Sequence, residues 1–326
     1  LCTYNGAEFM QAQLESIRTQ TVLPDELVVG DDLSNDATVS IIENFVGSAP
    51  FSVRLKINEN NLGSTKNFEQ TISRCTGDII FLSDQDDVWL RHKIEKIITE
   101  FEKNAAIGMV FSNAELVDEK LKSLGRKLWD FSFLPKYRRK IKNESFFELL
   151  LWQNIVTGAT MAFRAKFRQS FAPIPTHIPN FIHDAWISLV IAAQAQIGFI
   201  DEPLIKYRQH PKQQLGIDRK YENRRMRYED SIKSCREDLK RLDLMREVLN
   251  DYPQFQNAGT ENYFDELINR YLDEKRELIE HFAVRMKMPK AKLKRISPIL
   301  QEIQNGRYRH FSKGLASAAK DFLGNE

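Results

Sequence analysis

The chain has 326 residues, of which 42% are hydrophobic and 28% charged, and its formal net charge at neutral pH is +2. This composition is typical of a globular protein with one large domain or two ordinary ones. No apolar run approaches the ~18 residues that a membrane-spanning helix needs, and no signal peptide is visible.

The cysteines and the first residues bear on the compartment and on the start of the fold. Cys2, Cys75 and Cys235 have no metal-binding spacing and cannot form an even set of disulfides. They therefore fit a reducing cytoplasm. The chain begins at Leu1, without Met, in residues typical of the end of a strand. We therefore expect that the first strand is truncated.

Short apolar runs alternate with amphipathic stretches over the first 90 residues. We expect strands at the end of residues 1–6 and at 27–30, 53–57 and 79–82, and helices over 7–19, 39–45 and 65–75. This rhythm predicts an α/β fold, with a Rossmann-like, mostly parallel sheet flanked by helices. Ligands of such sheets bind beyond the carboxyl ends of the strands, so residues 3–5, 31–32 and 84–87 should converge on one crevice.

The second part of the chain continues this pattern and then changes character. We expect helices over 90–101, 146–152 and 182–193, strands at 109–111, 155–163, 197–200 and 204–207, and a loop or flap over 118–142. After residue 216 the chain is highly charged, with apolar residues at helical spacing. The sequence therefore predicts an α/β domain over 1–216 and a helical, basic C-terminal region over 217–326.

The most informative stretch is the acidic run that follows the strand expected at 79–82. Asp84, Asp86 and Asp87 place three carboxylates within four residues. Such close like charges repel, and a Mg²⁺ or Mn²⁺ ion would remove the repulsion while taking hard oxygen ligands. The alternative is a solvated acidic turn before a helix that begins near Val88, where acids suit the helix dipole.

Four other positions carry candidate chemistry, each with a plain structural alternative. Asp32 could accept hydrogen bonds from a nucleobase or a ribose, or form a helix-entry turn. Lys66 could reach a phosphate, or be a solvated helix lysine. Gly158 could let the backbone approach a ligand closely, or mark a bulge. Asp184 could be a general base, or interact with a helix dipole.

His210 is the fifth such position, since it could be a neutral imidazole ligand of a metal ion or an ordinary loop residue. Six motifs then occur in order along residues 1–216. They are Cys2-Thr3-Tyr4-Asn5-Gly6, Asp31-Asp32, Ser83-Asp84-Gln85-Asp86-Asp87-Val88-Trp89, Thr157-Gly158-Ala159-Thr160, His183-Asp184-Ala185-Trp186 and Tyr207-Arg208-Gln209-His210. Together they resemble family 2 glycosyltransferases of the GT-A fold. The form of the acidic motif, Asp84-Gln85-Asp86-Asp87-Val88-Trp89, most resembles bacterial rhamnosyltransferase-like members.

The resemblance implies a role for each matching residue. The donor would be bound by Thr3, Asn5, Asp32, Lys66, Asp84 and Asp86, with Asp32 on the base and Asp84 toward the ribose. Asp86 and His210 would bind the metal ion, and Gly158 and Trp186 would lie on the acceptor side. Asp184 would be the catalytic residue. Two departures matter, because the family often has Arg where Lys66 stands and a second aromatic residue where Ala185 stands.

The resemblance further implies an inverting glycosyltransferase that uses Mn²⁺ or Mg²⁺. It would move a rhamnose-like sugar from a dTDP- or UDP-sugar donor to a saccharide or lipid-linked saccharide acceptor in bacterial surface polysaccharide synthesis. A nucleotidyltransferase would share the nucleotide and the metal, but it would need a basic Gly-rich loop that residues 3–7 do not offer. A non-catalytic nucleotide-sugar-binding relative is the other alternative.

The C-terminal region is strongly basic. From 281 to 320 there are ten Lys or Arg residues and one acid, Glu302. The cations are Arg285, Lys287, Lys290, Lys292, Lys294, Arg295, Arg307, Arg309, Lys313 and Lys320. This charge predicts peripheral contact with an anionic membrane, at the inner face of the cell membrane, or else a helical cap on the α/β domain. No nucleic-acid recognition motif accompanies it, so we expect no nucleic acid partner.

Overall fold

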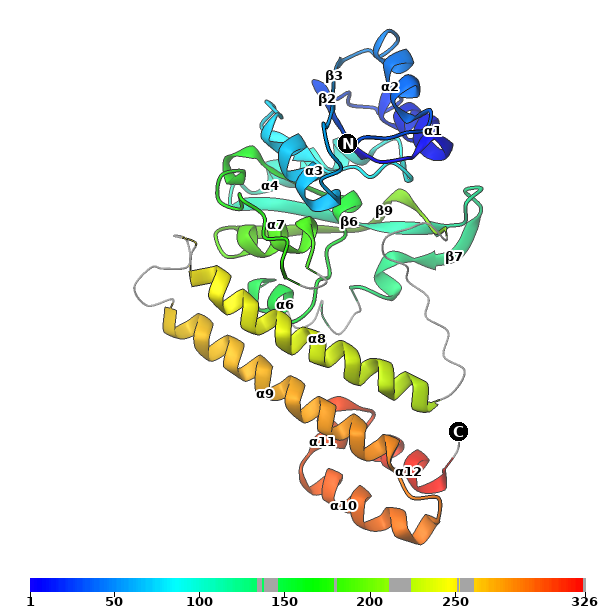
Figure 1. The fold of residues 1–326 in the computed structure, drawn as a ribbon, viewed down its shortest axis with the longest axis vertical. Helices are drawn as coiled ribbons and strands as arrows, with labels where there is room; N and C mark the ends of the chain where they lie inside the picture. The colour runs from blue at the N-terminus through cyan, green and yellow to red at the C-terminus, as the bar shows by residue number, and fades with distance from the viewer. Residues whose placement is uncertain are drawn as a thin grey trace. The chain divides into compact units, whose positions relative to one another are not determined.

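The structure is a computed structural model that describes residues 1–133, 137, 146–178, 181–210, 224–250, 252 and 261–324 (Figure 1). It divides into two compact units. The first comprises Leu1–His177 and Phe181–Ile217, and the second Ile178–Asn180 and Asp218–Glu326. That residues 1–216 fold as a domain of their own stays a prediction.

Three parallel strands open the first unit, in the order β1-β2-β3. They are β1 (Cys2–Thr3), β2 (Glu26–Asp31) and β3 (Ser52–Ile57). Helices connect them: α1 (Ala7–Arg18), α2 (Thr38–Val46) and, after β3, α3 (Ser64–Ser73). Strand β2 is central and almost wholly buried, whereas β3 alternates between exposed and half-buried residues, as an edge strand does.

The other strands of this unit form a second, mixed sheet in the order β4-β8-β6-β9-β5, with β7 paired to β6. They are β4 (Ile79–Phe81), β5 (Val88–Trp89), β6 (Ile107–Val117), β7 (Ser123–Lys127), β8 (Met161–Arg164) and β9 (Gln196–Arg208). β6 and β9 are parallel, while β8 runs antiparallel to both β4 and β6. The amide of Cys2 donates to the carbonyl of Ser83 (3.2 Å), which joins β1 to the residues that follow β4.

Helices α4 (Lys93–Lys103), α6 (Phe146–Trp152) and α7 (His183–Ala192) complete the first unit, with 3₁₀ turns at Leu128–Asp130, Gly158–Thr160 and Ala165–Phe167. The apolar face of α4 packs on the second sheet. Ile97 and Phe101 join Val110, Ala162 and Leu204 in one buried cluster. Ile79 and Phe81 of β4 pack against this cluster, so α4 supports the strand that leads into the acidic loop.

Several local expectations differ from the structure. Val88 begins no helix; it lies in β5, which pairs with β9, and the helix begins at Lys93. The two strands expected at 197–200 and 204–207 are one strand with register shifts. Gly158 lies in a 3₁₀ turn rather than in a strand. The flap expected over 118–142 contains β7, and its residues 134–136 and 138–142 lie outside the described residues.

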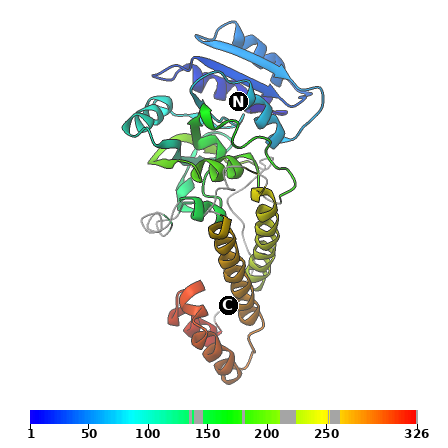
Figure 2. The same cartoon turned by 90° about the vertical axis from the view of Figure 1, so that its left-hand side faces the viewer.

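The second unit is helical. Figure 2 shows the long helices α8 (Arg224–Asn250) and α9 (Glu261–Met286) side by side, followed by α10 (Ile296–Gln304), α11 (Arg307–Phe311) and α12 (Leu315–Leu323). The buried apolar residues on α8 and α9 are Tyr228, Ile232, Cys235, Leu242, Met245, Val248, Leu249, Leu267, Ile268, Tyr271 and Leu272.

Charged residues are also buried between these two helices. Asp238 of α8 pairs with Lys275 of α9 and, at 3.3 Å, with Arg241 one turn further along α8. Both cations are almost fully buried. In the described part of the chain, no helix has the length and apolar character needed to cross a membrane.

Candidate active site

The acidic loop that follows β4 is fastened to the end of β1 by a side-chain amide. Gln85 accepts a hydrogen bond from the amide of Tyr4 (2.8 Å) and donates one to its carbonyl (3.0 Å). Gly6 leaves room for this side chain, because a Cβ there would overlap it. The middle residue of the Asp84-Gln85-Asp86 motif is therefore a structural bridge, a role that sequence analysis missed by treating it as a spacer.

The carboxylates of this loop repel one another in a buried place. Burial, and then the charges of Asp86 and Asp184, raise the pKa of Asp84 to about 7. Burial, with the charges of Asp86 and Asp84, holds the pKa of Asp87 well above its usual range. Asp87 accepts the amide of Arg208 on one oxygen (3.0 Å), while its other oxygen has no hydrogen bond within the described residues. Because Asp184 raises the pKa of Asp84, the two carboxylates lie within electrostatic reach of each other.

Lys93 is a buried lysine close enough to this loop to feel the charges of Asp87 and Asp84. Its side chain is fully buried, donates to the carbonyl of Ala159 (2.7 Å), and lies 3.9 Å from the ring centroid of Trp89. Burial lowers its pKa to about 7, against the opposing effect of Asp87 and Asp84. Sequence analysis missed Lys93, although its position gave a signal: it lies on the apolar stripe of α4, where a lysine needs a partner.

His210 and Asp86 are in direct contact. The imidazole Nε2 lies 2.8 Å from a carboxylate oxygen of Asp86, and the ring packs on Phe9 at 4.8 Å between centroids. Arg208 donates to the carbonyl of Asp86 (2.6 Å), so the end of β9 is tied to the acidic loop. The structure thus brings together the two residues expected to hold the metal ion.

The donor set suits a divalent cation that also binds a substrate. Among the described residues, no group of three or more His, Cys, Asp or Glu side chains could hold a metal ion. Asp86 and His210 offer a hard oxygen and an imidazole nitrogen, and a cation there would favour the ionised forms of Asp84 and Asp87, whose pKa values are raised by burial and mutual repulsion. Mg²⁺ commonly takes one or two protein carboxylates and fills its remaining positions with phosphates and water. The residues present therefore fit such an ion.

Asp184 lies in the first turn of α7, and its carboxylate accepts three hydrogen bonds. One oxygen accepts the amide of Gly158 (2.9 Å), and the other accepts the amide of Ala185 (2.6 Å) and the side-chain amide of Asn154 (3.3 Å). Burial raises its pKa to about 6, although these hydrogen bonds act in the opposite direction. The side chain is therefore fixed in position and unusually basic for a carboxylate. Asn154 was another residue that sequence analysis missed.

His183 stands beside Asp184 and explains the glycine at 158. Its ring stacks on Phe68 with centroids 3.9 Å apart, and neither ring nitrogen has a hydrogen-bond partner among the described residues. Burial lowers its pKa to about 3, so it is neutral at physiological pH. A Cβ at Gly158 would lie 3.1 Å from Nε2 of His183 and 3.4 Å from Cβ of Asp184. The absence of a side chain therefore lets the turn approach α7.

The residues expected to bind the nucleotide lie at the ends of β1 and β2. Asp32 is buried, and its carboxylate accepts the amides of Leu62 (2.8 Å) and Gly63 (2.9 Å) and the side-chain amide of Asn58 (2.9 Å). Asp32 therefore orders the loop between β3 and α3. Thr3 donates to Asp31 (2.7 Å), its neighbour across the strand pair.

Three other expected residues make their hydrogen bonds to residues outside the acidic loop. Asn5 is exposed, and its side chain accepts the amide of Asn35 (2.9 Å). Lys66 contacts Glu69 (2.9 Å) and the carbonyl of Ile174 (3.0 Å). Trp186 is fully buried and donates to the carbonyl of Phe171 (2.9 Å). The Trp186 ring is therefore part of the packed core.

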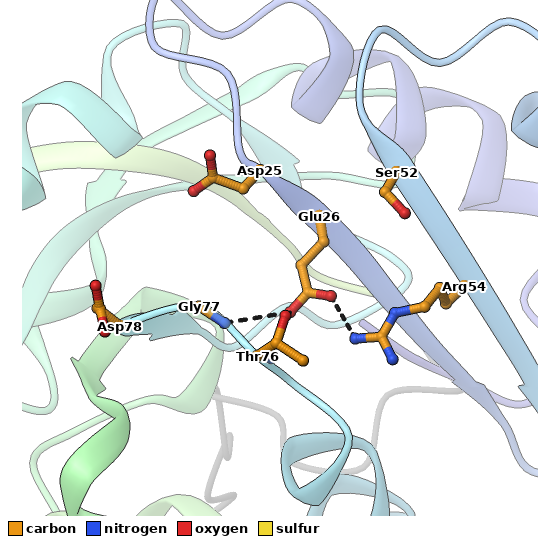
Figure 3. A pocket seen from close by; sticks show the side chains of 7 residues that line it. All are labelled: Asp25, Glu26, Ser52, Arg54, Thr76, Gly77 and Asp78. Atoms are coloured by element: carbon orange, nitrogen blue, oxygen red, sulfur yellow. Dashed lines mark hydrogen bonds and ion pairs between the residues drawn. The ribbon is translucent and has the colours of Figure 1, made fainter.

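A hollow at the opposite, amino-terminal edge of the strands is lined by Asp25, Glu26, Ser52, Arg54, Thr76, Gly77 and Asp78 (Figure 3). At its centre Glu26 pairs with Arg54 and accepts the amide of Thr76 (2.6 Å). The carboxylate thereby fastens the chain before β4 to the start of β2. We assign this hollow a structural role.

The fold and the acidic group define a glycosyltransferase of the GT-A type, and comparison with known proteins agrees. Residues 1–171 match the model of glycosyl transferase family 2. The chain therefore belongs to this family, and the resemblance drawn from its motifs is confirmed. It is similar to the dTDP-rhamnosyl transferase RfbG of Shigella flexneri, with 28% identity over 231 residues, 67% of this chain and 74% of that protein.

Other similar proteins confirm the fold. The putative glycosyltransferase EpsE of Bacillus subtilis is 30% identical over 118 residues, 36% of this chain and 42% of that protein. Crystalline TarS 1-349 of S. aureus superimposes with a TM-score of 0.56 at 15% identity, covering 91% of this chain and 77% of that one. The mannosyltransferase PcManGT of Pyrobaculum calidifontis, in complex with GDP-Man and Mn²⁺, superimposes with a TM-score of 0.50 at 17% identity. The match covers 100% of this chain and 86% of that one.

Proposed function

We propose that this protein is an inverting, metal-dependent glycosyltransferase with Asp184 as its catalytic base. The observation that carries the proposal is the Asp184 carboxylate, which is buried, fixed by three hydrogen bonds, and within electrostatic reach of Asp84 in the acidic loop. A basic carboxylate beside a cation site is what the transfer of a sugar from a diphosphate to a hydroxyl group requires.

Asp184 takes the proton of the acceptor hydroxyl group. With a pKa of about 6, it is mostly ionised at neutral pH and is a stronger base than an ordinary aspartate. The hydroxyl oxygen then forms a bond to the anomeric carbon while the bond from that carbon to the diphosphate oxygen breaks. One displacement inverts the anomeric centre and needs no covalent intermediate with the protein.

Asp86 and His210 would hold a Mn²⁺ or Mg²⁺ ion. When bound, such an ion neutralises the diphosphate and stabilises it as a leaving group. The contact between Asp86 and His210 and the charge gathered around them support this assignment. The Mn²⁺ in the PcManGT complex adds support from a protein of the same fold.

The remaining residues position the donor and the acceptor. Asp32, which orders the loop after β3, would bind the base, Thr3 would contact the nucleotide, and Asp84 would contact the ribose. The Gly158 turn, which the acceptor would approach, holds Asp184 through its backbone amide. Lys66 reaches a phosphate only if it leaves Glu69 and the carbonyl of Ile174.

The proposed donor is a dTDP- or UDP-activated sugar of the rhamnose type. Support comes from the name of the similar Shigella protein, a dTDP-rhamnosyl transferase. We propose a saccharide or lipid-linked saccharide as acceptor, in the synthesis of a bacterial surface polysaccharide at the cytoplasmic face of the membrane.

The test combines donor binding with turnover. Calorimetry with dTDP-rhamnose, UDP-sugars and GDP-mannose, each with and without Mn²⁺, identifies the donor. Release of nucleoside diphosphate with saccharide acceptors then measures transfer, and NMR of the product gives its anomeric configuration. Donor binding without transfer to any acceptor would favour a non-catalytic relative, and release of pyrophosphate would favour a nucleotidyltransferase.

A further inference from the structure

The basic C-terminal segment divides into cations that stabilise the fold and cations that do not. Arg285 pairs with Asp321 (2.7 Å), Arg307 pairs with Glu302 (3.1 Å), and Arg295 donates to backbone carbonyls. The other seven cations of the segment are exposed. They are Lys287, Lys290, Lys292, Lys294, Arg309, Lys313 and Lys320.

Large apolar side chains are exposed among these cations. Leu293, between Lys292 and Lys294, is 79% exposed, and Leu315, two residues after Lys313, is 73% exposed. The other exposed apolar residues of the segment are Ile296, Leu300, Phe322 and Leu323. The small core beneath them is formed by Ile299, Tyr308 and Ala318, so the exposed residues are surplus to the packing of the helices.

Arg295 brings the two parts of this surface together. Its guanidinium donates to the carbonyls of Pro289 (2.5 Å) and Lys290 (2.9 Å) and also to those of Asp321 and Phe322 (both 3.2 Å). The lysine-rich turn that carries Leu293 is thereby held against the carboxyl end of α12, which carries Phe322 and Leu323. Apolar side chains from two separate segments therefore lie at the same end of this group of helices, beside exposed lysines.

We propose that this surface, comprising Lys290 to Leu300 and Lys313 to Leu323, docks the protein on an anionic phospholipid bilayer. Lysines would attract the negative leaflet, and exposed leucines would enter its interfacial layer; this combination of charge and apolar contact is what reversible membrane binding requires. The proposal does not depend on the proposed reaction, because it rests only on the charge and exposure of these residues.

The charge of the surface favours a bilayer over a second copy of the chain. Between 287 and 324 the acidic residues are Glu302 and Asp321 alone, and both are buried and paired with arginines. Two such surfaces placed face to face would bring cations against cations. A nucleic acid would accept the lysines, but its phosphates would leave Leu293 and Leu315 without apolar partners.

Co-sedimentation of the full chain with vesicles tests this proposal. We expect binding to phosphatidylcholine vesicles that contain about one third phosphatidylglycerol, a fall in binding with added salt, and little binding to pure phosphatidylcholine. K292Q/K294Q should weaken binding by about 30-fold, which is ~1 kcal/mol for each lysine. L293Q/L315Q should weaken it by about tenfold or more, because both side chains lose apolar contact.

Matched controls make similar changes elsewhere on the chain. K233Q/K240Q neutralises two exposed lysines of α8, and L23Q replaces an exposed leucine of the first unit. Both should bind vesicles as the unaltered protein does. The proposal is overturned if the anionic vesicles do not retain the protein, if salt has no effect, or if the controls lose binding equally. Self-association that L293Q/L315Q abolishes, without vesicle binding, would instead identify a second copy as the partner.

Discussion

Replacing Asp184 with Asn gives the sharpest test of the proposed reaction. The variant keeps the size of the side chain but cannot take a proton. We expect turnover to fall by roughly 10²- to 10⁴-fold, the usual contribution of a general base, while donor affinity stays nearly unchanged. Release of nucleoside diphosphate measures the first quantity and calorimetry the second.

The pH dependence follows from the raised pKa of Asp184. In the unaltered protein, kcat/KM should rise about tenfold per pH unit below pH 6 and level off above it, because only the ionised carboxylate accepts a proton. The residual activity of D184N should lack this step. D25N, which changes an exposed aspartate at the opposite edge of the sheet, should keep both the step and the turnover.

The same pKa predicts how the variant affects stability. Asp184 keeps its proton up to a pH of about 6 in the folded protein but only up to 3.8 in a model peptide. The contribution of Asp184 to the free energy of unfolding should therefore be greatest below about pH 4 and fall by about 3 kcal/mol between pH 4 and pH 6, at 1.36 kcal/mol per pKa unit. D184N should lack this fall.

D184N also loses part of a hydrogen-bond arrangement. The side-chain NH₂ group of the introduced asparagine would face the backbone N–H of Gly158 or Ala185, and two donors cannot form a hydrogen bond. The free energy of unfolding should fall by about 1–3 kcal/mol as a result. Above about pH 7, D184N avoids the free-energy cost of a buried ionised carboxylate but loses a hydrogen bond, and these two effects nearly offset each other. Denaturation by urea should therefore show little net destabilisation of the variant. Near-normal turnover in a folded D184N, or a loss of donor affinity as large as the loss of turnover, would remove Asp184 from its role as the base.

Three further variants address the acidic loop. Asp86→Ala should abolish Mn²⁺-dependent donor binding in calorimetry, and unchanged affinity would show that the metal assignment is wrong. Lys93→Met leaves the buried carbonyl of Ala159 without its donor, so urea denaturation should show a loss of roughly 1–3 kcal/mol; an unchanged midpoint would contradict this. Gln85→Ala removes two hydrogen bonds to Tyr4, so the free energy of unfolding should fall by about 1–3 kcal/mol, and equal stability would refute the bridge.

The order of strands and helices in the first unit could be predicted because its signals are local. Apolar runs such as the one before Asp84 end in acids, and the hydrogen bond from Cys2 to Ser83 brings the end of β1 beside the residues that follow β4. The strand at Val88 could not be predicted, since two residues carry no period and their partner in β9 lies more than a hundred positions away. Because the pairing of Val88 with β9 cannot be seen in the local sequence, the acidic residues before it were interpreted as the start of a helix.

The candidate site was predictable in its charged residues and less so in its supports. Asp84, Asp86, Asp184 and His210 stood in motifs, and the structure brings them into one electrostatic group. The supporting residues were not predictable because their partners are distant in sequence. Lys93 contacts the carbonyl of Ala159, Asn154 the carboxylate of Asp184, and Gln85 the backbone of Tyr4, so no local pattern reveals these contacts. Trp186 stood in a motif and Lys66 at a position where the family often has Arg, but their contacts are set by packing that a motif does not encode.

The buried charges between α8 and α9 have a consequence for how this helical hairpin aligns. Leucine and isoleucine contacts tolerate a slip of one helical turn, because one apolar side chain can replace another. Asp238 cannot be replaced in this way, since a slip would separate it from Lys275 of α9, whose side chain is almost fully buried. Separating a buried cation from its partner carboxylate destabilises the fold. This penalty favours one axial register over others that would bury similar apolar area. The ion pair therefore fixes how α8 and α9 align along their axes.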